Sequence, residues 1–216
     1  MNASGTRNQE DIMQIGKFGL QVLNILKKLA NLDIELICSL HGPIYRTKED
    51  IIACFKKYQT WGSYSPEDDE VVIFSGSVYG NTEDFSTLLA TLVAQRGIRN
   101  TKVLDISSID VSYLLSEAFR AKVLVFASSS YNGGLFTPME NFLMDLVAHN
   151  FQNRDVFVVE NGSWALTAGK SMREIIGQLK KVNIAEETIS IKSLLSKDQY
   201  ADTVAMADKI VECLNK

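Results

Sequence analysis

The sequence has few of the residues on which metal and disulfide sites depend. It contains two histidines, His41 and His149, and three cysteines that are widely spaced and form no CxxC pair. Two imidazoles cannot supply a histidine-rich metal centre. Cysteines so placed are expected to be buried free thiols. No Ser/His/Asp or Cys/His grouping for nucleophilic catalysis can be read from the sequence.

Long apolar runs and runs of basic residues are also missing. The longest apolar stretches, "VLVFAS" and "VVIFS", are far shorter than the about 20 residues of a membrane-spanning helix. The net charge is −4, and without a basic run we expect no nucleic-acid partner and no membrane partner. The first residues, "MNASGTRNQEDIMQ", lack the apolar core of a signal peptide, so we expect a cytoplasmic protein.

Residues 67–216 alternate short apolar runs with helical patterns. The apolar runs are nearly continuous in Val, Ile and Phe, which is typical of strands covered on both faces. Five strand–helix units in series predict an α/β fold, a doubly wound five-stranded parallel sheet in the order 2-1-3-4-5 with helices on both faces. The expected strands are 71–75, 102–106, 122–128, 155–160 and 188–192, and the expected helices are 82–96, 110–120, 138–150, 169–181 and 199–214.

Residues 1–66 do not continue this pattern. They predict an amphipathic helix in 11–30, a short strand over 34–40 and a second helix over 48–61, with a linker over 62–70. A helix, a strand and a helix cannot enclose a core. We therefore expect an N-terminal appendage, residues 1–66, that either packs on the α/β domain, residues 67–216, or completes something outside this chain.

The stretch "GSVYGNTE", Gly76 to Glu83, follows the first expected strand and opens the next helix. It has neither the lysine of a P-loop nor the three glycines of a dinucleotide fingerprint. Backbone N–H groups and the hydroxyls of Ser77 and Thr82 can surround a monophosphate at this helix N-terminus without any cation. The alternative is an ordinary helix start capped by Thr82.

Two further polar loops follow the third and fourth strands. The loop "SSSYNGGLFTPM" displays Tyr131 beside hydroxyls, and "ENGSWALTAGK" exposes Trp164. Each aromatic alone is more often a packing residue, but parallel strands bring all three loops to one edge of the sheet. A phosphate anchor, a polar rim and stacking aromatics suit FMN. The predicted FMN-binding residues are Ser77, Val78, Tyr79, Gly80, Asn81, Thr82, Ser129, Ser130, Tyr131, Asn132, Gly133, Gly134, Asn161, Gly162, Ser163 and Trp164.

These stretches also resemble a known family. "VVIFSGSVYGNTE", "SSSYNGGLFTPMENFL" and "VVENGSWALTAGKSM" resemble the three FMN-binding loops of flavodoxin-like domains, and more specifically the flavodoxin domain of the flavodiiron proteins (A-type flavoproteins). In that family the domain follows a metallo-β-lactamase-like diiron domain. "LDIELICSLHGPIYR" resembles the last strand and turn of that diiron domain, and "YQTWGSYSPEDDEVV" resembles the interdomain connection. The resemblance covers residues 11–216.

The departures from the family limit what the resemblance implies. The family's H-x-[EH]-x-D-H motif and its other iron ligands are upstream of this chain's first residue, and only His41 matches a ligand position. We therefore expect no metal site and no diiron catalysis by this chain alone. Ser129 and Thr137 replace prolines of many relatives, which predicts a looser second loop. Its glycines would let a backbone peptide reorient beside the flavin ring.

The resulting functional prediction is an electron-transfer flavoprotein. It would relay electrons from a reductase or a rubredoxin-type donor to an acceptor. The alternatives are the flavin subunit of a two-chain flavodiiron oxygen or nitric oxide reductase with its diiron domain on a separate chain, an FMN-dependent quinone reductase, and a non-redox scaffold. The family resemblance also implies a head-to-tail homodimer.

Overall fold

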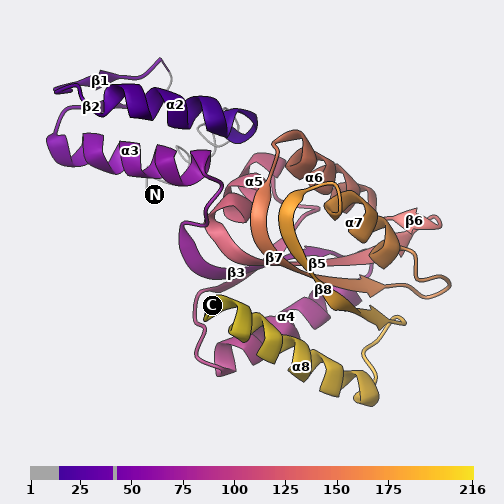
Figure 1. Cartoon of the computed structure of the whole chain (residues 1–216). Helices are drawn as coiled ribbons and strands as arrows, with labels where there is room; N and C mark the ends of the chain where they lie inside the picture. Colours follow the sequence, from indigo (N-terminus) through magenta and orange to yellow (C-terminus); the bar gives the residue numbers. More distant parts are fainter. Residues whose placement is uncertain (1–14, 41–42) are drawn as a thin grey trace.

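A five-stranded parallel sheet lies at the centre of the computed structural model, which describes residues 15–40 and 43–216 (Figure 1). The strands run in the spatial order β4-β3-β5-β7-β8, and all four neighbouring pairs are parallel. This confirms the predicted order 2-1-3-4-5. The strands are β3 (Asp68–Gly76), β4 (Thr101–Asp105), β5 (Ala121–Tyr131), β7 (Gln152–Asn161) and β8 (Lys180–Ile191). A short strand, β6 (Gly134–Leu135), pairs antiparallel with the end of β5.

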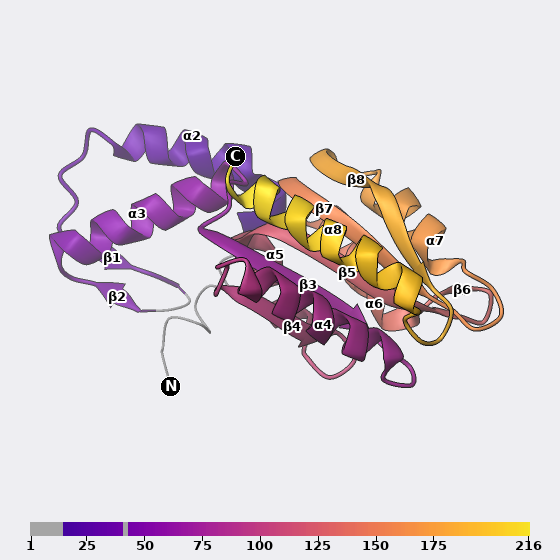
Figure 2. The same cartoon turned by 90° about the horizontal axis from the view of Figure 1, so that it is seen from below.

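Helices cover both faces of this sheet, as Figures 1 and 2 show. Helices α4 (Asn81–Gln95) and α8 (Lys197–Leu214) pack on one face, and α5 (Val111–Arg120), α6 (Thr137–Ala148) and α7 (Ala168–Ile176) pack on the other. Neighbouring strand residues enter opposite cores because strand side chains alternate. Ile73 lies in the core beneath α4 and α8, whereas Phe74 lies in the other, stacked on Phe126 at 5.5 Å between ring centroids. The predicted doubly wound sandwich is confirmed.

The end of α7 (Ala168–Ile176) and the start of β8 differ from the prediction. The helix expected over 169–181 ends at Ile176, and β8 begins at Lys180 instead of residue 188. The first half of β8 pairs with β7, for example Arg154 with Val182. Its side chains are mostly exposed or half-buried because β8 is an edge strand. The charged, weakly apolar sequence therefore does not carry the continuous apolar signal of the central strands.

The N-terminal appendage consists of a 3₁₀ turn η1 (Gly16–Phe18), helix α2 (Gly19–Leu29), a hairpin of β1 (Ile37–Cys38) and β2 (Ile44–Tyr45), and helix α3 (Lys48–Gly62). The strand expected over 34–40 is therefore only two residues long, and His41 lies outside the described residues. The backbones of α2 and α3 lie so close together that a Cβ on Gly19 would be 2.5 Å from the Gly62 carbonyl oxygen. Glycine is required at this crossing.

Tyr64 and Arg154 bond the appendage to the sandwich. The Tyr64 hydroxyl donates to the Gly16 carbonyl at 2.6 Å and accepts from Asn150 Nδ2 at 3.1 Å. The buried Arg154 guanidinium donates to the carbonyls of Tyr64 and Ala121, at 2.6 Å each. Trp61 and Tyr64 also join the apolar core. Of the two outcomes left open by the sequence, the appendage packs on the α/β part, while the boundary at residue 66 stays a prediction.

Apolar side chains nevertheless remain exposed on the appendage. Leu20 is 68% exposed and Ile25 is 55% exposed on α2. Further exposed apolar residues are Phe18, Leu32, Leu36, Leu40, Ile44 and Ile52. In the part of the chain that the structure describes, no helix is long and apolar enough to cross a membrane.

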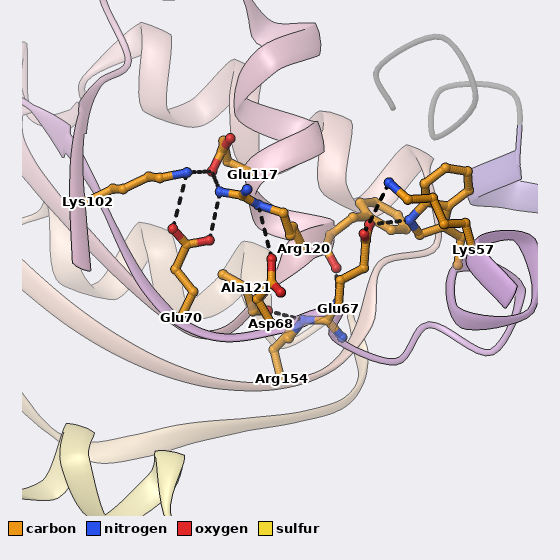
Figure 3. Close-up of polar contacts among 11 residues, drawn as sticks. Lys57, Glu67, Asp68, Glu70, Lys102, Glu117, Arg120, Ala121 and Arg154 are labelled. Carbon is orange, nitrogen blue, oxygen red and sulfur yellow. Dashed lines mark hydrogen bonds and ion pairs between the residues drawn. The ribbon is translucent and has the colours of Figure 1, made fainter. Parts of the chain in front are cut away.

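A network of charged groups surrounds the buried Glu70 near the amino end of β3 (Figure 3). The Glu70 carboxylate is fully buried and lies 2.8 Å from Arg120 Nη2 and 3.1 Å from Lys102 Nζ. Glu117 lies 2.6 Å from the same Arg120 nitrogen and 2.8 Å from Lys102. Burial raises the pKa of the Glu70 carboxyl, against the opposing effect of Arg120 and Lys102. Burial also lowers the pKa of Arg154 to about 9.

Candidate functional site

The loops after β3, β5 and β7 enclose a cavity of about 490 Å³ at the carboxyl edge of the sheet. This volume lies within the about 300–1,000 Å³ of small-molecule and cofactor sites. All the residues predicted to bind FMN line it except Gly80 and Gly134. The topology thus brings together three segments that are far apart in the sequence. The full lining is Ser77, Val78, Tyr79, Asn81, Thr82, Ser129, Ser130, Tyr131, Asn132, Gly133, Asn161, Gly162, Ser163, Trp164, Ala165 and Ser193.

The N-terminus of α4 lies in the wall of this cavity. Gly80 is the N-cap residue with a φ of +90°, and no side chain caps the helix. The Gly80 N–H donates to Ser77 Oγ at 2.9 Å, which closes the loop. The buried Thr82 hydroxyl lies inside the first turn, 3.0 Å from Ser129 Oγ. The alternative of a helix start capped by Thr82 is therefore wrong, and the amide groups of the first turn stand beside three hydroxyls.

The N-terminus of α7 reaches the same edge but is capped within the protein. Ser130 Oγ accepts from the N–H groups of Thr167 at 3.0 Å and Ala168 at 3.2 Å. The Glu160 carboxylate accepts from the Gly169 N–H at 2.7 Å. Because a carboxylate already occupies the α7 end, an anion at this edge is directed to α4.

The second loop forms a tight hairpin between β5 and β6. Tyr131 pairs with Gly134, and the two residues between them, Asn132 and Gly133, have φ values of +48° and +75°. Positive φ at both central residues is the type I′ geometry that Asn-Gly favours. This turn, together with the hydrogen bond from the Phe136 N–H to the Ser129 carbonyl at 3.2 Å, ties the two sides of the loop together.

Aromatic side chains form the outer rim of the cavity. Tyr79 is 90% exposed, Trp164 is fully exposed, and Tyr131 is half-exposed with an edge-to-face contact to Phe136. Large aromatic groups exposed beside a cavity favour a planar ligand. The side chains that line the cavity include no charged group among the residues that the structure describes.

Sequence reasoning missed Ser193, which lies in the segment after β8. The stretch "KSLLSKDQY" contains no glycine and no aromatic residue before its final tyrosine, so it does not stand out as a binding loop. The usable signal was topological, because the carboxyl end of the fifth strand also lies at this edge.

Comparison with known proteins agrees with this description. No family model matches the chain. A flavo-diiron protein of Clostridium acetobutylicum is 26% identical over 169 residues, which are 77% of this chain and 40% of that protein. The rubredoxin oxygen:oxidoreductase of Desulfovibrio gigas superposes with a TM-score of 0.86 at 20% identity, over 97% of this chain and 53% of that one.

A smaller protein matches about two thirds of the chain. An archaeal flavodoxin superposes with a TM-score of 0.57 at 16% identity and covers 68% of this chain and 99% of its own. The chain spans about half the length, or less, of the curated relatives it matches. The chain is thus similar in sequence to flavodiiron proteins over most of its length, and it shares its fold with a flavodoxin.

Proposed function

We propose that this chain binds FMN in the cavity at the carboxyl edge of the sheet and transfers electrons through it. One observation carries the proposal. The uncapped N-terminus of α4, the hydroxyls beside it and the exposed aromatics all line the same cavity. The names of the relatives, a flavo-diiron protein and a flavodoxin, support a flavin as the ligand.

The residues present fit the parts of FMN. The phosphate would bind the first amide groups of α4 and the hydroxyls of Ser77 and Thr82, because a helix N-terminus favours an anion and a left-handed Gly80 leaves space for it. The planar ring would lie among Tyr79, Tyr131 and Trp164. When bound, FMN supplies one- and two-electron exchange, and the chain binds, orients and partly covers the ring.

The charges around the cavity influence the reduction potential of a bound flavin. The described lining carries no cation, and the first turn of α4 adds two carboxylates, Glu83 and Asp84. Negative charge that develops on a reduced ring would therefore have no nearby positive partner. We expect a low reduction potential, which suits a carrier that passes electrons onward.

The experiment is reduction of the FMN-loaded protein followed by electron transfer. Rubredoxin is the first donor to test, because the Desulfovibrio relative is named for it, and a flavin reductase is the second. Reversible reduction of bound flavin by either donor supports the carrier function. If neither donor reduces the bound flavin, but the protein oxidises a nicotinamide and reduces quinones, the function is that of a quinone reductase instead of a carrier. If the protein binds no flavin, the non-redox scaffold is the remaining interpretation. A cytoplasmic location stays part of the proposal.

The appendage favours a second candidate, the flavin subunit of a two-chain reductase. Its exposed apolar residues, among them Leu20 and Ile25, are held at a set orientation by Tyr64 and Arg154. Such a surface is typical of an interface. The candidate predicts that a separately produced diiron-domain chain binds this one with micromolar affinity or better, and that replacing Leu20 and Ile25 with Lys abolishes binding. A homodimer that the same replacement dissociates would favour self-association instead, and an unaffected monomer would refute both.

A further inference from the structure

A reciprocal pair of hydrogen bonds joins the loop after β7 to the segment after β8. The Asn161 side chain donates from Nδ2 to the Ser193 carbonyl at 3.1 Å and accepts at Oδ1 from the Ser193 N–H at 3.0 Å. Ser163 Oγ lies 2.9 Å from Ser193 Oγ. Both polar ends of the buried Asn161 amide are therefore used within the protein.

Ser193 has an unusual backbone conformation. Its φ is +64°, and the Leu194 N–H donates to the Lys192 carbonyl at 2.8 Å across it. A three-residue turn with positive φ at a residue other than glycine is rare and strained. Such strain persists only where surrounding contacts determine the conformation, and it concentrates at functional sites. Here the contacts that determine it come from Asn161 and Ser163.

The segment between Asn161 and Thr167 is bonded at both ends. At its start, the Gly162 N–H donates to the Ile191 carbonyl at 3.0 Å, beside the Asn161–Ser193 pair. At its end, the Thr167 N–H donates to Ser130 Oγ and the Thr167 hydroxyl donates to the Gly134 carbonyl at 3.1 Å. The middle carries Trp164, whose side chain is fully exposed. The backbone alone therefore places this tryptophan at the cavity.

We propose that the Asn161–Ser193 pair is a positioning device that sets the loop 162–166, and with it Trp164, against the ring of the bound flavin. The inference rests on the proposed function. Asn161 acts through the loop and does not bind the cofactor with its side chain. The pair therefore affects the ring end of the ligand and leaves the phosphate end at α4 unchanged.

The test compares FMN with riboflavin, which has the same ring and no phosphate. Asn161→Ala is expected to weaken both ligands equally, by about tenfold, because the two hydrogen bonds between its side chain and the Ser193 backbone are lost. The absorption and circular dichroism of bound FMN should change as well. Asn183→Ala, which removes an exposed amide contact to Asp155 far from the cavity, is the control.

A second readout does not depend on flavin. In the flavin-free protein, Asn161→Ala should speed amide hydrogen exchange in 162–166 by about tenfold while exchange in the β5 core is unchanged. If that variant does not fold, Asn161→Asp keeps the acceptor for the Ser193 N–H, loses the donor and adds a negative charge beside the Ser193 carbonyl. Unchanged exchange in 162–166, or unchanged flavin affinity and spectrum, would overturn the inference. A wild-type protein that binds neither FMN nor riboflavin would overturn the proposed function instead.

Discussion

At the scale of single residues, the proposed phosphate site at the N-terminus of α4 depends on Gly80. Its φ of +90° precedes α4, and a Cβ built there would meet no atom within 4 Å. Gly97 has a φ of +93° and equally open surroundings, at the far end of the same helix. The two glycines therefore form a matched pair for separating backbone strain from ligand binding.

Gly80→Ala and Gly97→Ala should each lower the free energy of unfolding by about 1 kcal/mol, because alanine is strained at positive φ. Only Gly80→Ala should weaken FMN, by about tenfold, because its Cβ and altered backbone disturb the phosphate site. Riboflavin binding should be unaffected in both. Urea unfolding and flavin fluorescence titration measure the two effects. Equal loss of FMN affinity in both variants would show that the α4 N-terminus does not hold the phosphate.

Glu70 gives a prediction about pH. Burial raises its carboxyl pKa above the ordinary value of 4.5, so the folded state holds this proton more tightly than the unfolded state does. The stability that this provides is fully present below pH 4.5 and is lost as the pH rises through the folded-state pKa.

The Glu70→Gln variant should therefore gain stability relative to wild type as the pH rises above 4.5. At neutral pH its free energy of unfolding should equal that of wild type or exceed it by up to about 1 kcal/mol. Glu117 remains to pair with Arg120 and Lys102, as Figure 3 shows. Thermal unfolding across this pH range is the measurement. Asp69→Asn, at an exposed neighbouring carboxylate, should leave the pH dependence unaltered. A Glu70→Gln protein much less stable than wild type at neutral pH would contradict the argument.

At the scale of secondary-structure elements, Arg154 joins β7 to its surroundings. Its guanidinium donates to carbonyls of α5, the start of β5 and the linker, including those of Phe119, Ala121 and Tyr64. Arg154→Met keeps most of the apolar volume but removes this donor from all three carbonyls, and the Tyr64 carbonyl keeps only the 3.5 Å contact from Asn153 Nδ2. Each unsatisfied group costs about 1–3 kcal/mol.

We expect Arg154→Met to lower the free energy of unfolding by about 3 kcal/mol or more. Limited proteolysis should then cut near residues 62–67 before the sheet is cut, because the linker loses the bond at Tyr64. Lys122→Met, which loses a partly exposed contact to the Leu214 carbonyl and an ion pair with the exposed Asp69, is the matched control and should cost about 1 kcal/mol. A cleavage pattern that does not change would contradict a role for Arg154 in holding the appendage.

The β5–β6 hairpin yields a prediction for the flavin. Gly133→Ala places a side chain at a φ of +75°, which should cost about 1 kcal/mol of unfolding free energy and distort the turn beside the ring. Gly97→Ala is again the control for strain. The reduction potentials of bound FMN should change in Gly133→Ala and not in Gly97→Ala. Reduction potentials equal to those of wild type in both variants would show that this loop does not influence the potential of the flavin.

The elements that the sequence predicts best are those with continuous apolar runs. Residues 71–75 and 122–128 lie in β3 and β5 because their Val, Ile and Phe side chains are buried on both faces. The first half of β8 has no such run because it lies at an edge, and its pairing with β7 comes from the tertiary structure. Ser193 was missed for a similar reason, since its role depends on hydrogen bonds to Asn161 that no local pattern signals.

At the scale of the whole molecule, the cavity and the apolar surface of the appendage lie toward opposite ends of the folded protein. The cavity is at the carboxyl ends of the strands. The appendage joins the amino end of β3 (Figure 1). The three predicted loops converge because parallel strands place their carboxyl ends together. The sequence predicts that α2 is amphipathic. It does not predict what covers the apolar face of α2, because the spacing of apolar residues says nothing about the partner.

The most direct test of the central claim is the absorption spectrum of the purified protein, with the released cofactor identified and quantified. The account predicts a yellow protein with one FMN per chain, or a colourless protein that takes up one FMN per chain when FMN is added and is then reversibly reduced. A protein that stays colourless and does not bind added FMN would contradict the account and leave a flavodoxin-like scaffold without redox function.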